Sequence, residues 1–153
     1  MWLIKLVITI FLALSSMSSF AKAQSTSLDN IAACVGIVIG NASADFILGD
    51  EQSFDEQINI AYTAYLSEIF SGEYPESDLQ LADIILGANT DKIINAVNSG
   101  TFTTDTYEEV IVCYRALGQQ LIEKAETILN YQTNWNEIKN NQIEIIKRVL
   151  QAG

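Results

Sequence analysis

The residues of this chain that could do chemistry are two cysteines and an excess of carboxylates, with no histidine beside them. A chain without histidine cannot build a Ser/His/Asp triad, a Cys/His nucleophile or a histidine-ligated zinc site. Two cysteines are too few for a four-cysteine zinc or iron–sulfur site. No phosphate-binding glycine loop and no nucleophile-elbow motif occurs along the sequence. We therefore predict that the protein is not an enzyme and holds no metal or cofactor.

The 19 acidic residues leave two carboxylate chemistries as alternatives. A small enzyme could use a pair of carboxylates as acid and base, but nothing in the sequence marks one pair among many. Calcium prefers oxygen ligands, and Asp50, Glu51, Asp55 and Glu56 form a dense acidic cluster. Their spacing is not that of an EF-hand loop, and acidic residues are also common in the first turn of a helix.

The two cysteines, Cys34 and Cys113, lie 79 positions apart and not in a C-x-x-C arrangement. That spacing favours a structural bridge over a redox-active pair. Closing so long a loop would stabilise the fold by about 4–5 kcal/mol in the chain-entropy model. We predict one disulfide between Cys34 and Cys113.

The N-terminal segment has the pattern of a secretory signal peptide. Lys5 provides the positive start, Leu6 to Leu14 is apolar apart from Thr9, and Ala21-Lys22-Ala23 matches a cleavage site. We predict that residues 1–23 are a cleavable signal and that the protein is periplasmic or secreted, an environment that favours disulfide formation.

The remaining residues, 24–153, are predicted to form a single all-helical domain. They contain no second apolar run of the kind that would anchor the mature chain stably in a membrane. The whole chain carries a net charge of −11, and removal of the two lysines of the signal lowers it to −13. This charge excludes a nucleic-acid-binding protein, because phosphate binding requires a basic surface. The acidic charge fits a surface that keeps the protein soluble, and a basic binding partner is the alternative.

Apolar residues recur at three- and four-residue spacing, and no segment alternates with a period of two. We predict an all-α fold of about five helices in one bundle-like domain. Ser53 with Glu56 and Ser77 with Gln80 have capping-box spacing and predict two of the helix starts. Glycines predict most of the helix ends. The expected helices span residues 28–48, 54–70, 77–87, 89–100 and 104–150.

The last of these segments follows a heptad pattern for more than five repeats, from Val110 to Val149. It predicts a long C-terminal helix, with a kink near residues 130–136 as an option. The helix could pack across the others in a monomer or form a coiled-coil dimer. Its amphipathic C-terminal half gives a candidate interaction face for a protein or a small apolar ligand, consisting of Trp135, Ile138, Ile145 and Val149.

Two resemblances accompany these patterns. The segment Cys34-Val35-Gly36-Ile37-Val38-Ile39-Gly40 resembles the start of the first helix in small exported immunity-type proteins. The layout of a signal peptide, two widely spaced cysteines and a helical body resembles that of periplasmic acid-stress chaperones. Neither resemblance assigns a role to a residue. The signal peptide, the cysteine pair, the acidic helices and the lack of catalytic motifs predict a small acidic binding protein of the bacterial cell envelope. An acid-stress or immunity-type chaperone is the alternative.

Overall fold

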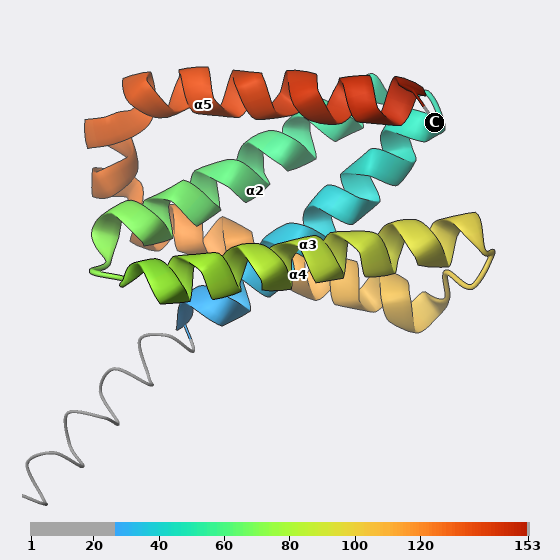
Figure 1. Ribbon diagram of the computed structural model, residues 1–153, viewed down its shortest axis with the longest axis horizontal. Helices are drawn as coiled ribbons and strands as arrows, with labels where there is room; N and C mark the ends of the chain where they lie inside the picture. The colour runs from blue at the N-terminus through green and yellow to red at the C-terminus, as the bar shows by residue number, and fades with distance from the viewer. Residues whose placement is uncertain (1–26, 153) are drawn as a thin grey trace, which may run out of the picture.

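The computed structural model describes residues 27–152, and within them it is an all-α bundle with no strand (Figure 1). The N-terminal helix spans Ser27–Ile47, and four more helices follow it. These are α2 (Glu51–Ser71), α3 (Glu76–Asn98), α4 (Thr104–Glu123) and α5 (Ala125–Ala152). The predicted all-α fold with a long C-terminal helix is confirmed. The predicted signal peptide, residues 1–23, lies outside the described residues.

The N-terminal helix is the centre of the core. Its side chains Val35, Val38 and Ala42 have no exposed surface. By length and composition it is the one helix among the described residues that is apolar enough to cross a membrane, yet more than half of its most apolar stretch is buried inside the bundle. Burial against its neighbours therefore accounts for its apolar sequence.

Two glycines let this helix approach α3 closely. A Cβ atom on Gly36 would lie 2.2 Å from the backbone oxygen of Leu86, and one on Gly40 would lie 2.7 Å from Cβ of Ile93. The backbone oxygen of Gly36 also accepts a hydrogen bond from the hydroxyl of Thr90 at 3.1 Å. The lack of a side chain at both positions is thus what sets the distance between the two helices.

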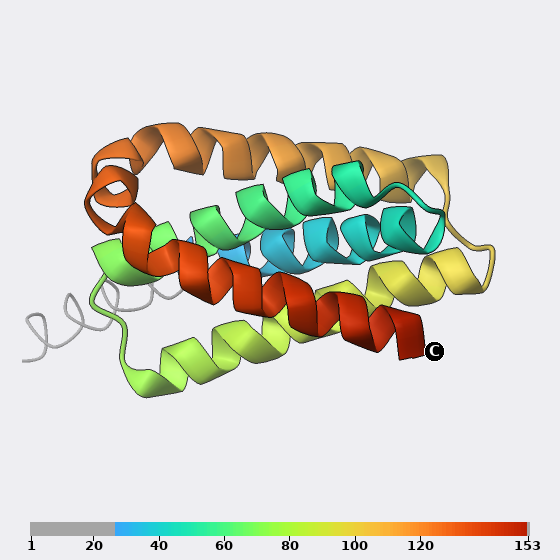
Figure 2. The same ribbon diagram turned by 90° about the horizontal axis from the view of Figure 1, so that it is seen from above.

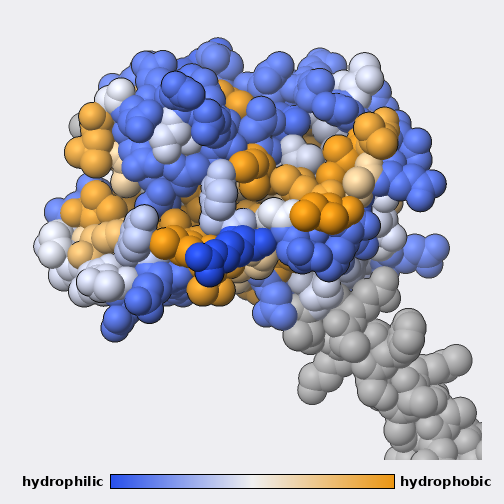
Figure 3. Space-filling view, turned by 180° about the vertical axis from the view of Figure 1, so that it is seen from behind, coloured by the Kyte–Doolittle hydropathy of each residue, from blue (hydrophilic) through white to orange (hydrophobic). Residues whose placement is uncertain are grey.

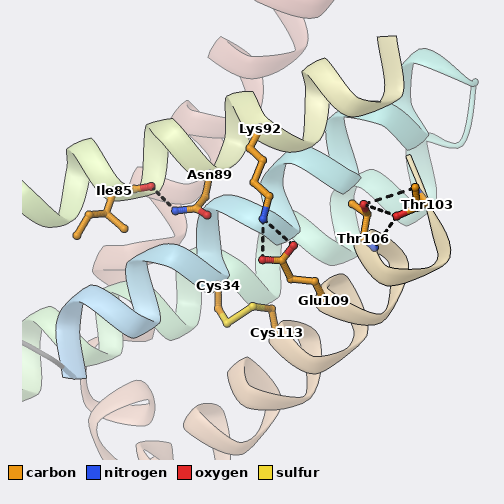
Figure 4. Close-up of polar contacts among 8 residues, drawn as sticks. All are labelled: Cys34, Ile85, Asn89, Lys92, Thr103, Thr106, Glu109 and Cys113. Atoms are coloured by element: carbon orange, nitrogen blue, oxygen red, sulfur yellow. Dashed lines mark hydrogen bonds and ion pairs between the residues drawn. A yellow bond between two sulfur atoms is a disulfide. The ribbon is translucent and has the colours of Figure 1, made fainter. Parts of the chain in front are cut away.

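The predicted disulfide is confirmed and joins the N-terminal helix to α4 through Cys34 and Cys113 (Figure 4). On the same side of the molecule, Nζ of Lys92 on α3 donates to both carboxylate oxygens of Glu109 on α4, at 2.8 and 2.7 Å. A covalent bond and an ion pair therefore attach α4 to the first and third helices, and α2 contacts it as well.

Several predicted helix ends are wrong. Asp50, not Ser53, caps α2, because its carboxylate accepts from the backbone N–H of Ser53 at 3.0 Å. Pro75 precedes α3 without any side-chain cap, so the predicted Ser77 box is absent. The chain passes through Gly87 without leaving the helix, which merges two predicted short helices into the single helix α3.

The predicted helix from residue 104 to residue 150 is also wrong in one respect, since it breaks at Lys124 between α4 and α5. Figure 2 shows α4 and α5 diverging from this turn, with α2 between them. The break allows both helices to bury apolar residues against α2, which a single straight helix could not do. Val110, Leu117 and Trp135 of the heptad pattern are buried within the bundle itself, so the pattern is not available as one continuous coiled-coil seam.

Candidate functional site

The divergence of α4 and α5 opens a pocket over α2, with a volume of about 530 Å³. Its floor is the outward face of α2, formed by Glu56, Asn59, Ile60 and Thr63. Leu121 near the end of α4 closes one side. The opposite side comes from successive turns of α5, which contribute Ile128, Gln132, Trp135, Asn136 and Lys139. We call this site the Lys139 pocket, and its volume is in the range of small-molecule sites.

Lys139 is the unusual residue of this pocket. Only 7 % of its surface is exposed, although it carries an ammonium group. Its Nζ donates to the hydroxyl of Thr63 at 3.1 Å, and no carboxylate among residues 27–152 lies within ion-pair distance of it. Because burial disfavours the charged form, the pKa of Lys139 is lowered from its ordinary value.

The other lysines in the described part of the chain are all paired. Lys92 contacts Glu109 at 2.7 Å, Lys124 contacts Glu68 at 3.7 Å, and Lys147 contacts Asp55 at 2.9 Å. The chain contains 19 acidic residues, so carboxylates are abundant. The most buried lysine is nevertheless the one without an acidic partner, and lysines are almost never buried unless they are paired.

Trp135 of the pocket wall belongs to an aromatic cluster between α2 and α5. The rings of Phe70, Tyr131 and Trp135 lie with centroids 5.4 to 5.8 Å apart. Trp135 is buried, and its indole N–H finds no hydrogen-bond acceptor among residues 27–152. The pocket is therefore bordered by two side chains, Trp135 and Lys139, with unmet donor capacity.

A second cavity of about 440 Å³ lies nearer the start of α2, between the end of the N-terminal helix and α4. Several of its polar side chains on the first two helices bind one another. Gln57 accepts from Asn41 at 2.8 Å and donates to Asp45 at 2.6 Å, and Ser53 donates to the same carboxylate at 2.8 Å. This network fastens the first two helices together. On the α4 side, Tyr107, Tyr114 and Arg115 also line the cavity.

A buried carboxylate on α2 holds the turn between α4 and α5 in place. Glu68 is 5 % exposed and accepts hydrogen bonds from Tyr74 and, at 2.6 Å, from Gln120. Lys124, the residue at the break, contributes the ion pair already described. Burial and the hydrogen bond to Glu68 both raise the pKa of Tyr74. The cluster fixes where α5 starts, and so it fixes the shape of the pocket.

The residues of the predicted interaction face do not share one surface in the structure. Trp135 is buried and borders the Lys139 pocket. Ile138, Ile145 and Val149 lie on the outer side of α5, with 40 %, 51 % and 67 % of their surfaces exposed. The side of α5 that packs on the core instead carries Ile143, Ile146 and Leu150.

The acidic cluster that suggested calcium is engaged in structural contacts. Asp50 caps α2, Asp55 pairs with Lys147, and Glu56 accepts from Gln52 at 3.0 Å. Within residues 27–152, no group of acidic or cysteine side chains is arranged to hold a metal ion.

The face opposite to that of Figure 1 is mostly hydrophilic where α5 lies, and hydrophobic side chains gather in separate groups across its middle (Figure 3). Comparison with known proteins adds no assignment to these surfaces. No family model, no curated protein and no solved structure matches the chain. The chemistry of the site must therefore be read from its own residues.

Proposed function

We propose that this protein is a small exported binding protein, without catalytic activity, whose ligand occupies the Lys139 pocket. The observation that carries the proposal is the buried ammonium of Lys139, which borders a 530 Å³ cavity and has a single neutral hydrogen-bond partner. A bound molecule would supply the missing contacts. The disulfide supports an oxidising compartment, and the signal-peptide pattern supports export to the periplasm of a bacterium or to the outside of the cell.

The pocket is well suited to binding because of how it is framed. α2 is fixed to the N-terminal helix by the Gln57 network, and α4 is fixed to that helix by the disulfide. Glu68 and its partners hold the turn from which α5 departs. A cavity bounded by such fastened helices is largely formed before a ligand arrives, and this reduces the entropic cost of binding.

Native mass spectrometry of protein purified from its own cells tests the proposal. We expect a small molecule to be retained by the wild-type protein and lost from Asn59→Phe, which fills the pocket from α2. Glu51→Phe is the matched control, since Glu51 is exposed on the same helix and lines neither cavity. A bare protein in all three samples would contradict the proposal.

One observation favours the alternative of an acid-stress chaperone. The chain carries 19 acidic and eight basic residues, so neutralisation of its carboxylates in acid would leave it with a net positive charge. The protein would then open in acid and expose apolar surface. Acid-induced binding of an apolar dye, together with suppressed aggregation of a client protein, would support this function, and the absence of both would exclude it.

A further inference from the structure

We propose that the ligand of the Lys139 pocket is an amphiphile with a single negatively charged head group, of which a fatty carboxylate is the simplest example. The head group would pair with the ammonium of Lys139, and the apolar part would lie against Leu121 and Ile128. This inference rests on the proposed function, because it names the class of ligand for that same pocket.

The anionic head group follows from the hydrogen-bonding state of Lys139. An ammonium group has three N–H donors, and here one of them is used by Thr63. The hydroxyl of Thr63 itself donates to the backbone oxygen of Asn59 at 2.6 Å, so it serves Lys139 as an acceptor. A carboxylate entering the pocket would offer charged acceptors to the two remaining donors, and charge-assisted hydrogen bonds of this kind are the strong ones.

The apolar part follows from the other walls. Ile60, Leu121 and Ile128 provide aliphatic surface, and Trp135 provides an aromatic face. The residues that α5 contributes begin at Ile128 and end at Lys139, a rise of up to about 16 Å along a helix. A linear chain of about a dozen carbon atoms is of this length, and burial of its methylene groups would favour binding.

The restriction to one negative charge follows from Glu56. It is the single acidic residue that lines the pocket, and it lies seven residues before Thr63 on α2, about 10 Å along the helix. Gln52 satisfies one of its oxygens at 3.0 Å, and the side chain is exposed. A second negative charge on the ligand would be repelled by Glu56, whereas one charge placed at Lys139 would not approach it closely.

The test is isothermal titration calorimetry of the mature, disulfide-bonded protein with dodecanoate below its critical micelle concentration, and with 1-dodecanol as the uncharged probe of equal length. We expect dodecanoate to bind at one site and 1-dodecanol to bind at least tenfold more weakly. Lys139→Met should lower the affinity for dodecanoate at least tenfold, because it removes the charged hydrogen-bond donors of the head-group contact. Lys139→Arg should retain most of the affinity, and Glu56→Gln should retain or increase it.

Lys92→Met is the matched control, since Lys92 is exposed and paired on a different part of the surface. It should bind dodecanoate as the wild type does. Equal affinity of wild type and Lys139→Met for dodecanoate would overturn the proposed head-group contact. If neither probe binds while native mass spectrometry finds another ligand that Asn59→Phe loses, the amphiphile is refuted and the binding function stands. If nothing binds in either experiment, both proposals fail.

Discussion

The replacement Lys139→Met should stabilise the ligand-free protein. Lys139 is 93 % buried and its charge has a neutral hydroxyl as its partner, so the folded state bears a desolvation penalty that the unfolded state does not. Methionine has a similar length and no charge, and it would keep the contacts of the aliphatic stem. The hydroxyl of Thr63 loses the hydrogen bond that it accepts from Lys139 but still donates to the backbone oxygen of Asn59, so no buried donor is left unsatisfied.

The expected gain is about 1–2 kcal/mol in the free energy of unfolding, at the lower end of what replacing buried charges by apolar residues gives. For a domain of this size it corresponds to a rise in Tm of about 3–8 °C. Urea unfolding followed by circular dichroism, and thermal unfolding, would measure it. Lys92→Met, which removes an exposed ion pair, should change stability by less than about 0.5–1 kcal/mol.

The pH dependence of this gain has a definite sign. Because the pKa of Lys139 is lowered in the folded state, the unfolded chain binds more protons between that lowered value and 10.5. The stability of the wild type relative to Lys139→Met should therefore rise with pH over this interval, and the gap should be widest at lower pH. A Lys139→Met protein less stable than the wild type by more than 1 kcal/mol would refute the reasoning, since Lys139 would then be a stabilising residue.

Three further predictions follow from the framework of the bundle. Gly36→Ala should lower the free energy of unfolding by about 1–3 kcal/mol, because its Cβ would collide with the backbone of α3. Gly87→Ala should raise it by about 0.5–1 kcal/mol, since no atom lies within 4 Å of the added Cβ. Urea titrations of the two variants would compare these changes. Glu68→Gln should cost about 2–4 kcal/mol by removing a buried charge from its partners, and chemical denaturation with an unchanged m-value checks it. Burial and hydrogen bonds to carboxylates raise the pKa of Tyr65 and of Tyr74, so the stability that these groups contribute is complete below pH 10 and is lost as the pH rises above it. Tyrosinate absorbance that develops only together with unfolding would agree with this prediction. Titration of both tyrosines near pH 10 in the folded protein would contradict it.

The number of helices could be predicted from the sequence, although two boundary errors cancel in that number. One helix end was predicted that the structure lacks, and one break in a helix was not predicted. Gly87 looked like a helix end, but it lies within α3, where tertiary contacts outweigh its weak helix propensity. Lys124 carried no signal of a helix end, and the chain breaks there because α5 has to fold back over α2. Local propensity does not contain that tertiary requirement.

The disulfide could be predicted from the cysteine count and the signal-peptide pattern, but the pocket could not. The predicted interaction face placed Ile138, Ile145 and Val149 together with Trp135, whereas the structure buries Trp135 and the neighbouring stripe that includes Lys139. The signal that was available is a lysine four residues after Trp135 and four before Ile143, on one face of a helix. Its partner across the pocket, Thr63, lies 76 positions away, and such a pairing is not visible in local sequence.

The most direct test of the central claim uses Trp135, which is the only tryptophan in a chain that begins at Gln24 and which borders the pocket. Its fluorescence should be recorded on protein purified from its own cells, again after bound small molecules are stripped on a hydrophobic resin, and finally after the stripped fraction is returned. We predict that stripping shifts the emission of Trp135 and that the returned fraction restores it saturably. An emission spectrum unchanged through all three steps would contradict a ligand in the Lys139 pocket.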